Sequence, residues 1–356
     1  MSRFAASSTA ARPPTASPPA RVGVLHGAGY VGGELLRLLA GHPHVALGAV
    51  TSRTFAGAPV GAAHASLRGQ VDQAFVAPDA LDAGALDALV VAAEHGQSMH
   101  LVPDLLDAGF EGPIVDLSAD FRFRDPSMYP TWFDEAHPAP GLLAEATYGL
   151  PEIDDGLGGA RLIANPGCYA TGIALALAPL AASGPPFTAH VTALTGASGS
   201  GATPSTATHY PTRDGNVRPY KVLAHQHDPE VRQALGGHVD LQFVPASGPW
   251  TRGIWGTAQI EGLSESETTV AEAFEALYAD APLVRCTPGV LPALQPTVGT
   301  PFCDLGWQVQ GETLVVGFAL DNLLKGAASQ ALQNLNRALD LPAPTGLLPQ
   351  PAAPPA

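Results

Sequence analysis

The first half of the chain alternates short apolar runs with segments of helical periodicity. Apolar runs predict strands at residues 21–25, 45–50, 87–93 and 113–117, and helices are predicted at 34–40 and 99–108. Strands that alternate with helices are typical of a parallel sheet whose two faces are both covered. The pattern therefore predicts an α/β fold that begins with a Rossmann-type, dinucleotide-binding domain over residues 21–165.

Beyond residue 165 the pattern changes. An Ala- and Leu-rich helix is predicted at 168–182, strands at 188–195, 239–245, 253–260, 306–310 and 313–320, and helices at 229–235 and 265–278. Successive strands with few crossovers indicate a mixed or antiparallel sheet. Residues 166–321 are therefore expected to form an α+β catalytic and oligomerisation domain. An amphipathic helix at 324–339 is expected to pack back on the first domain, so that the segment 322–341 completes it.

Composition sets the limits of this picture. Hydrophobic residues make up 46% of the 356 residues and charged residues 14%, which is enough apolar material for two packed domains. The segments 1–20 and 342–356 are rich in alanine and proline and are expected to be disordered tails. No apolar run reaches the roughly 18 residues of a membrane span, so no membrane association is expected.

Charge and cysteine content exclude several classes of function. The formal net charge of −15 argues against nucleic-acid binding, which needs a basic face, but a small phosphorylated substrate needs only a local cationic pocket. The three cysteines, Cys168, Cys286 and Cys303, show no CxxC spacing, which favours free thiols in a reducing cytoplasm. No HExxH motif or Cys/His cluster occurs, so no metal site is expected.

A glycine-rich turn follows the first predicted strand. Gly27-Ala28-Gly29-Tyr30-Val31-Gly32 fits the GxGxxG pattern and leads into the first helix. Glycines at these positions let the backbone approach a pyrophosphate at a helix N-terminus. The residues Gly27, Gly29, Tyr30, Val31 and Gly32 are therefore candidates for cofactor binding, although an ordinary tight turn would show the same spacing.

The end of the second predicted strand distinguishes the two nicotinamide cofactors. A carboxylate there is typical of NAD sites, where it binds the ribose hydroxyls. This chain has Thr51-Ser52-Arg53-Thr54 instead. A hydroxyl and a guanidinium suit the 2′-phosphate of NADP, so Ser52 and Arg53 predict NADP as the cofactor.

Cys168 is the candidate nucleophile. It follows Asn165-Pro166-Gly167 and begins the apolar helix, so free backbone N–H groups and the helix dipole are expected to lower the pKa of its thiol. The same N–H groups suit an oxyanion formed when the thiolate attacks a carbonyl. A buried structural cysteine is the alternative, and it is the role expected for Cys286 and Cys303.

A thiolate enzyme needs an acid or base, and His225 and His227 are the best candidates. Spacing of two residues in an extended chain would place both rings on one side. A surface pair is the alternative. Basic residues are few, and some of them are candidates to bind a phosphate or carboxylate: Arg122, Arg213, Arg218, Lys221 and Arg252.

Six strings then occur in a characteristic order: Gly29-Tyr30-Val31-Gly32-Gly33-Glu34-Leu35-Leu36-Arg37, Asp116-Leu117-Ser118-Ala119-Asp120-Phe121-Arg122, Tyr148-Gly149-Leu150-Pro151-Glu152, Asn165-Pro166-Gly167-Cys168-Tyr169, His225-Gln226-His227 and Asp321-Asn322-Leu323-Leu324-Lys325-Gly326. Together they resemble the N-acetyl-γ-glutamyl-phosphate reductases of arginine biosynthesis, over residues 22 to 341. Aspartate-semialdehyde and glyceraldehyde-phosphate dehydrogenases share the general layout, but these strings argue against both.

The resemblance implies a reaction and roles for individual residues. Cys168 would attack the γ-acyl phosphate and release phosphate, and hydride from NADPH would reduce the resulting thioester to the semialdehyde. His227 is favoured as the acid/base and His225 as a substrate contact, while Asn322 would lie near the nicotinamide. Arg122 would face the substrate. Apart from the resemblance, Asn165, Lys221 and Arg252 are further candidate substrate-binding residues, and a homo-oligomer is expected.

Some positions depart from the family pattern, and the region after residue 198 favours a second hypothesis. Glu94-His95-Gly96 stands where the family has Pro-His-Gly, and an arginine usual after Ser198-Gly199-Ser200-Gly201 is absent. The strings 51–57, 67–69 and 209–221 resemble a sister branch of lysine biosynthesis. That branch reduces an aminoadipyl or glutamyl phosphate attached to a small acidic carrier protein. Cys168-Tyr169 is of the arginine type, so the N-acetylated substrate is favoured.

Overall fold

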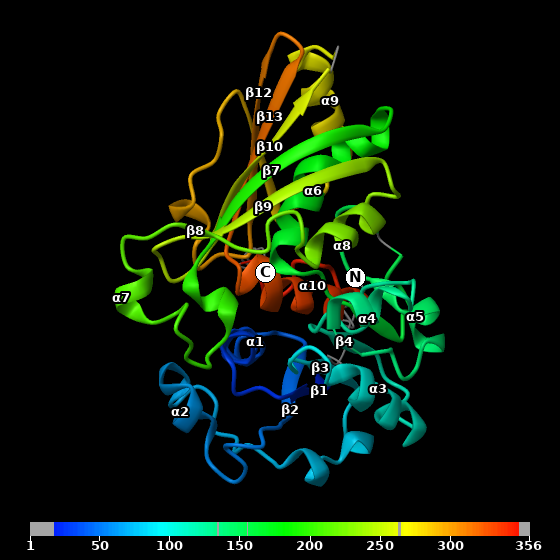
Figure 1. Cartoon of the computed structure of the whole chain (residues 1–356). Helices are drawn as coiled ribbons and strands as arrows, with labels where there is room; N and C mark the ends of the chain where they lie inside the picture. The colour runs from blue at the N-terminus through cyan, green and yellow to red at the C-terminus, as the bar shows by residue number, and fades with distance from the viewer. Residues whose placement is uncertain (1–17, 134, 155, 263–264, 349–356) are drawn as a thin grey trace, which may run out of the picture.

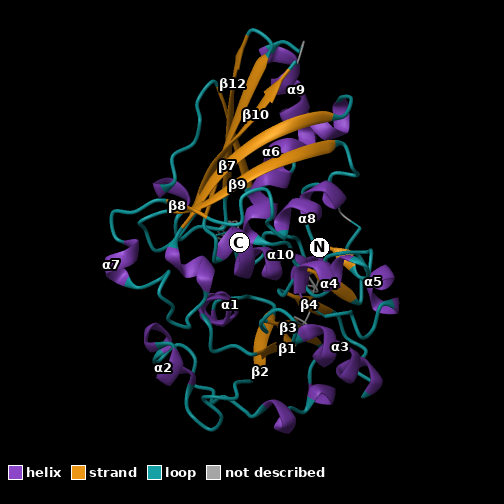
Figure 2. Ribbon diagram, viewed as in Figure 1, coloured by secondary structure: helices purple, strands orange, loops and turns teal. Residues whose placement is uncertain are grey.

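Two sheets organise the computed structural model, which describes residues 18–133, 135–154, 156–262 and 265–348 (Figures 1 and 2). The first sheet lies with the N-terminal half of the chain and the second with residues 187–320. Helix α6 (Cys168–Ser183) begins where the two parts meet. The predicted α/β architecture, with a parallel sheet and a mixed sheet, is confirmed.

The first sheet has six parallel strands in the described chain, in the order β2-β1-β3-β4-β6-β5. Its strands are β1 (Ala20–Leu25), β2 (Val45–Val50), β3 (Ala88–Val91), β4 (Ile114–Asp116), β5 (Thr147–Tyr148) and β6 (Leu162–Ala164). Successive residues of β3 alternate between two apolar clusters, because strand side chains point to opposite faces. Both faces are therefore buried, as the uninterrupted apolar run predicts.

Different helices cover the two faces of this sheet. Helix α1 (Tyr30–Ala40) and helix α10 (Ser329–Ala338) share one apolar cluster with Val90, so the last helix packs against the first sheet. Helix α3 (Ser98–Asp107) shares the other cluster with Val91. The remaining helices of this part are short: α2 (Val60–Ala63), α4 (Met128–Phe133) and α5 (Gly141–Glu145).

The second sheet is mixed, and seven strands belong to it in the described residues, in the order β11-β12-β13-β10-β7-β9-β8. They are β7 (Phe187–Thr195), β8 (Arg218–Pro219), β9 (Val239–Ser247), β10 (Ile254–Glu261), β11 (Val284–Pro288), β12 (Cys303–Gln310) and β13 (Thr313–Leu320). β7 pairs with β9 and β11 with β12 in parallel, and the other pairs are antiparallel. The short strands β8 and β11 are not evident in the sequence pattern.

Helix α6 is apolar on all sides because it lies between the second sheet and two further helices. It contacts β10, β13, α8 (His227–Ala234) and α9 (Glu267–Tyr278). All of its residues from Tyr169 to Leu180 are buried. This packing fixes the position of its first residue, Cys168, relative to α8. No helix in the described ranges has the length and apolar character needed to cross a membrane.

The C-terminal end corrects one prediction. Residues 342–348 were expected to be disordered, but they pack as turns against α10. The side chain of Asn336 donates hydrogen bonds to the carbonyls of Ala343 and Thr345 at 3.0 and 2.8 Å, and its Oδ1 bonds to His42 at 3.0 Å. A buried amide on the neighbouring helix thus orders a segment whose composition indicates no core of its own. Ala20, also placed in the expected N-terminal tail, begins β1, whereas residues 1–17 and 349–356 lie outside the described residues.

Candidate active site

A cleft of about 790 Å³ runs between the two parts of the chain. The predicted site residues that line it are Gly29, Tyr30, Val31, Gly32, Arg122, Asn165, Cys168, Lys221, His225, His227 and Asn322. Four others, Gly27, Ser52, Arg53 and Arg252, are not among its lining residues. The structure thus brings the cysteine, the histidine pair and most of the glycine turn to one cavity.

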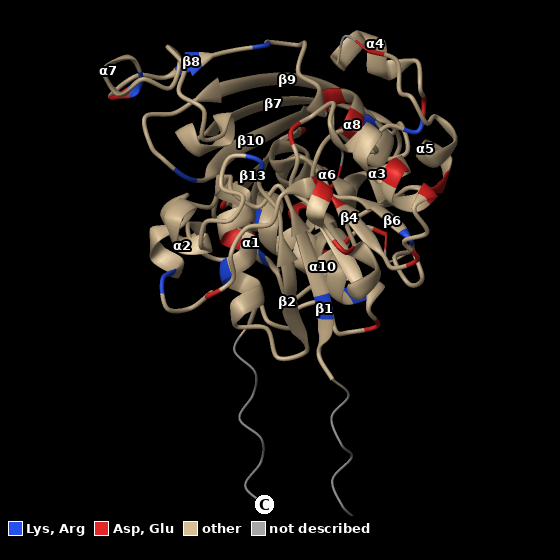
Figure 3. Ribbon diagram, turned by 90° about the horizontal axis from the view of Figure 1, so that it is seen from below, with Lys and Arg blue, Asp and Glu red and all other residues tan. Residues whose placement is uncertain are grey.

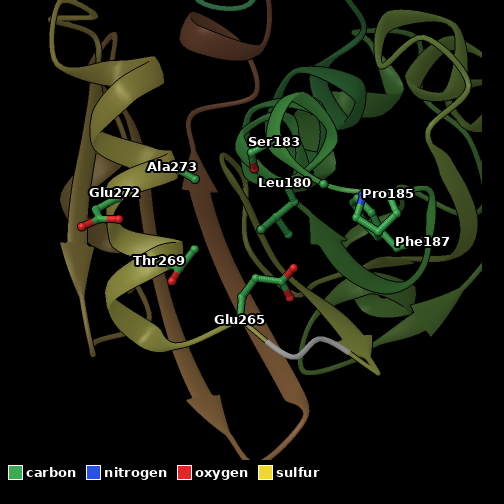
Figure 4. Close-up of a pocket in the computed structure, with 9 residues that line it drawn as sticks. Leu180, Ser183, Pro185, Phe187, Glu265, Thr269, Glu272 and Ala273 are labelled. Atoms are coloured by element: carbon green, nitrogen blue, oxygen red, sulfur yellow. The ribbon is translucent and has the colours of Figure 1, made fainter.

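A second cavity of about 350 Å³ lies between α6 and α9, at the end of α6 away from Cys168 (Figure 4). Leu180 and Phe187 line it, and the carboxylate of Glu265 points into it while that of Glu272 points away. Its described lining includes no cysteine, histidine or basic residue. The candidate chemistry therefore belongs to the larger cleft.

Cys168 is the first residue of α6, after an N-cap glycine in extended conformation. The thiol has no disulfide partner. Burial raises the pKa of Cys168 to about 11, although the Arg122 guanidinium and the first amides of α6 act in the opposite direction. The prediction of a lowered pKa is therefore wrong, because desolvation of the thiolate outweighs the helix terminus. A nucleophile in this position needs a neighbouring base.

His227 is the nearest candidate for such a base among the residues that line the cleft with Cys168. A β-carbon added to Gly167 would lie 2.2 Å from its Nε2, so the imidazole packs directly against the residue that precedes Cys168. Burial, His225 and Arg122 together hold the pKa of His227 well below its usual value. The ring is therefore neutral at physiological pH. Only glycine at position 167 leaves room for both the imidazole of His227 and the guanidinium of Arg122.

The histidine pair is close, but not for the reason predicted from its spacing. Gln226 has helical dihedral angles, and α8 begins at His227 rather than continuing an extended chain. The backbone N–H of His227 donates to Nδ1 of His225 at 3.1 Å, and the ring centroids lie 4.6 Å apart. Burial and, as a smaller contribution, the charge of Lys221 lower the pKa of His225 to about 4. Both rings are neutral.

Glu230 joins the elements around the cysteine, a role that the sequence alone did not suggest. It lies one helical turn after His227 and is buried. Its Oε1 accepts the N–H of Gly167 and the hydroxyl of Tyr148, both at 2.8 Å, and its Oε2 pairs with Arg122 Nη1 at 3.3 Å. The sequence offered one signal for Glu230: residues three apart in a helix share a face, so Glu230 lies on the same face of α8 as His227.

Arg122 and Asn165 face the cleft with much of their hydrogen-bonding capacity already used. The guanidinium of Arg122 also donates to the carbonyls of Asn165 and Leu117, at 2.8 and 2.9 Å. The amide of Asn165 accepts a bond from Asn334 at 2.9 Å and donates weakly to the carbonyl of Pro166. Both side chains therefore hold the loop before Cys168 in place.

The cleft is cationic in a chain of net charge −15. Its basic lining residues are Arg122, Arg213, Arg218 and Lys221, and Glu94 is the acidic one among the described residues. Three of the four basic residues come from the segment around α7 (Tyr210–Arg213) and β8, two elements that lie close together in Figure 3. A local excess of positive charge attracts an anionic substrate.

The glycine turn has the shape that a dinucleotide requires. Gly29 is the N-cap of α1, and a β-carbon there would meet nothing within 4 Å, so the approach to the helix N-terminus is open. A β-carbon on Gly32 would lie 2.4 Å from the carbonyl oxygen of Gly27, which excludes any side chain. His64, which sequence reasoning did not single out, bonds that carbonyl at 2.8 Å through Nε2. These residues fit a pyrophosphate.

Asn322 lines the same cleft as Cys168. Its Oδ1 accepts the backbone N–H of Gly253 at 2.7 Å, and its Nδ2 donates to the hydroxyl of Ser198 at 3.1 Å. Gly326, four residues later, lies against Cys168, since a β-carbon on it would be 2.8 Å from Cβ of the cysteine. The segment 321–326 thus forms the wall next to the thiol.

The structure places the other candidate residues elsewhere. Ser52 is buried, and its hydroxyl accepts the N–H of Phe55 at 3.2 Å, while Arg53 is exposed at the end of β2. Arg252 forms ion pairs with Glu34 at 2.6 Å and Asp321 at 3.0 Å. It ties α1 to the segment 321–326 and is not brought into the cleft.

Comparisons with known proteins agree with this geometry. Residues 21–156 match the model of the semialdehyde dehydrogenase NAD binding domain, and residues 168–322 match that of the semialdehyde dehydrogenase dimerisation domain. The N-acetyl-gamma-glutamyl-phosphate reductase of Methanopyrus kandleri is 44% identical over 324 residues, which cover 88% of this chain and 94% of that protein. The protein of the same name from Alkalilimnicola ehrlichii is 40% identical over 336 residues, covering 92% and 97%.

Solved structures show the same fold at low sequence identity. Aspartate semialdehyde dehydrogenase II of Vibrio cholerae gives a TM-score of 0.70 at 15% identity, covering 91% of this chain and 99% of that chain. The aspartate semialdehyde dehydrogenase of Candida albicans, solved with NADP, gives 0.67 at 14% identity, covering 90% and 99%. The arrangement of the two sheets is therefore shared with semialdehyde dehydrogenases.

Proposed function

The chain belongs to the N-acetyl-γ-glutamyl-phosphate reductase family, and we propose that it reduces N-acetyl-γ-glutamyl phosphate to the semialdehyde and phosphate in arginine biosynthesis. One observation carries the proposal: a cysteine at a helix N-terminus lies next to a neutral, buried histidine in a cationic cleft. A thiol, a base and a site for an anion are the groups that an acyl-phosphate reductase needs.

His227 and Cys168 perform the first step. Nε2 of His227 takes the proton of the thiol, and the thiolate attacks the acyl carbon of the substrate. The carbon–oxygen bond to the phosphoryl group breaks, phosphate leaves, and a thioester remains on Cys168. The amides at the start of α6 face the acyl oxygen as it becomes negative. His225 holds His227 in place by accepting its backbone N–H and is proposed to contact the substrate.

NADPH bound in the same cleft would supply the hydride that reduces the thioester to the aldehyde. Gly29, Tyr30, Val31 and Gly32 would hold its pyrophosphate at the N-terminus of α1. Ser52 and Arg53, at the end of the neighbouring strand β2, are proposed for the 2′-phosphate. Asn322 is proposed to border the nicotinamide, since it lines the wall beside the thiol.

The substrate's anionic groups are assigned to those cations of the cleft that form no ion pair within the described residues. Lys221 and Arg218 are exposed and line it, so we favour them for the substrate's phosphoryl and carboxylate groups. Arg122 acts on the substrate through its charge, because its donors are largely bound to protein. Asn165 is assigned a positioning role, and Arg252 has no place in this scheme.

A carrier-bound substrate of lysine biosynthesis is the second candidate, motivated by the strings at 51–57 and 209–221. The names of the relatives favour the N-acetylated substrate. We further propose a homodimer through the second domain, which is supported by the match to a dimerisation domain. A cytoplasmic location is supported by the three cysteines, all of them free thiols.

The test measures the reaction in the oxidative direction. The purified protein should sustain NADP reduction with N-acetylglutamate semialdehyde over many turnovers only when phosphate is present, and Cys168→Ala should lower the rate on the order of 10³-fold or more. Cys286→Ala, which changes a cysteine outside the cleft, is the matched control and should retain the rate. A Cys168→Ala variant that stays active, or a faster turnover of the carrier-bound substrate, would refute the proposal.

A further inference from the structure

His95 lies on the wall of the cleft, in the loop after β3, and the mechanism above gives its imidazole no role. Its Nδ1 accepts the backbone N–H of Ala119 at 2.9 Å. An amide N–H can be accepted only by a ring nitrogen that carries no hydrogen, so neutral His95 has its hydrogen on Nε2. The backbone therefore fixes the tautomer of this ring.

The Nε2–H group is available to a ligand. It has no hydrogen-bond partner within the part of the chain that the structure describes, and the side chain is exposed to the cleft. The surrounding protein disfavours a charge on the ring, and Arg122 and Lys221 act in the same direction, so the pKa of His95 falls to about 4. At neutral pH the ring is a fixed hydrogen-bond donor and does not act as a base.

We propose that His95 is a substrate-binding residue that donates its Nε2–H to the phosphoryl group of the acyl phosphate, and to phosphate in the reverse reaction. This inference rests on the proposed function. The phosphoryl group is favoured over the acyl oxygen because the acyl oxygen belongs at the start of α6. The phosphoryl group belongs with the positive charges of Lys221 and Arg122, which are the charges that act on His95.

The reverse reaction separates the phosphate step from the others. The semialdehyde and NADP first give the thioester on Cys168 and one equivalent of NADPH, without phosphate. An oxygen of phosphate then attacks the thioester carbon, the carbon–sulfur bond breaks, and the sulfur leaves as thiolate and regains a proton from His227. A burst of NADPH without phosphate therefore reports the first step, and the KM for phosphate reports the second.

Two substitutions at His95 distinguish its two nitrogens. In His95→Asn the amide oxygen replaces Nδ1 and still accepts the N–H of Ala119, but no donor reaches the position of Nε2. In His95→Gln the longer amide places an N–H close to the position of Nε2. We expect the KM for phosphate to rise about ten- to a hundredfold in His95→Asn, since a hydrogen bond to a charged group is lost. His95→Gln should recover most of this loss.

The matched control is His100→Asn, because His100 is an exposed histidine of α3 that bonds Glu135 and does not line the cleft. Its KM for phosphate should equal that of the unaltered protein. The burst rate of His95→Asn should fall by a smaller factor than the KM for phosphate rises. An unchanged KM in His95→Asn overturns the proposal, and so does a burst rate that falls as much as the KM rises.

A binding measurement keeps the two proposals apart. Phosphate that occupies the cleft should protect Cys168 from alkylation by iodoacetamide, and the protecting concentration should rise in His95→Asn but return in His95→Gln. This readout needs neither turnover nor the N-acetylated substrate. If the protein fails to turn over that substrate but shows this order of protection, the proposed function fails and the role of His95 stands. If turnover is normal and the protecting concentrations are equal, the proposed function stands and the role of His95 fails.

Discussion

Arg122–Glu230 and Lys325–Glu152 are both ion pairs that the fold buries, but they are placed differently with respect to the cleft. The side chains of the first pair are 4% and 1% exposed, and those of the second 0% and 2%. Each pair has a member next to a glycine that touches Cys168: Glu230 binds the N–H of Gly167, and Lys325 precedes Gly326. Burial and proximity therefore do not separate them.

The other contacts of the two ion pairs distinguish them. Arg122 lines the cleft, and Glu230 also holds Tyr148 and shares helix α8 with His227. Lys325 and Glu152 instead bond to Gln333 on α10, each at 2.8 Å, and neither lines the cleft. Loss of a charge from the first pair should therefore change the chemistry of the thiol, and loss from the second should change the stability of the fold.

Of the substitutions in these ion pairs, Lys325→Met should have the largest effect, and the property that changes should be the stability of the fold. It leaves the carboxylate of Glu152 buried without a counter-charge, which costs about 3–5 kcal/mol of the free energy of unfolding. Urea denaturation measures this loss. The double variant Lys325→Met/Glu152→Leu removes both charges and should recover most of it, because a buried pair replaced by apolar residues is often neutral. A single variant that loses less than about 1 kcal/mol would show that the second pair is not a structural element.

Glu230→Gln should affect the thiol more than the fold. The neutral amide can no longer pair with Arg122 or accept all three bonds, so kcat should fall about ten- to a hundredfold as the loop before Cys168 loosens. The negative charge of Glu230 raises the pKa of the thiol, so its removal should lower that pKa. The alkylation rate of Cys168 should then reach half its maximum at a lower pH.

Glu272→Gln is the control for that experiment, because Glu272 lines only the cavity at the far end of α6. It should leave kcat and the alkylation profile unchanged. An alkylation midpoint that stays in place or moves to higher pH in Glu230→Gln would mean that Glu230 does not act on the thiol, and the contrast between the two pairs would be lost.

The sequence predicted those parts of the site that are determined by residues adjacent in the chain. The glycine turn and the position of Cys168 at the start of a helix are local features, and both are found. The partners of Arg252 could not be predicted in this way, since Glu34 lies 218 residues away and Asp321 lies 69 residues away. Its assignment to the substrate rested on charge alone.

Burial is the second property that local patterns do not provide. The helix terminus at Cys168 predicted a lower thiol pKa, but the packing of α6 between a sheet and two helices desolvates the thiol and raises it. The histidine pair shows the same limit. Its spacing predicts both rings on one side of an extended chain, whereas α8 begins at His227 itself, and the fold brings the rings together by another geometry.

An exposed pair gives the smallest expected effect and completes the comparison. Arg285 binds Asp304 through two bonds of 2.6 and 2.9 Å and lies over the ring of Phe302, yet its side chain is 42% exposed. Arg285→Ala should cost less than about 1 kcal/mol of the free energy of unfolding, because water screens the pair, and the cost should shrink in high salt. Urea denaturation at low and high salt measures it. A loss as large as that of Lys325→Met would mean that burial does not decide what an ion pair contributes in this protein.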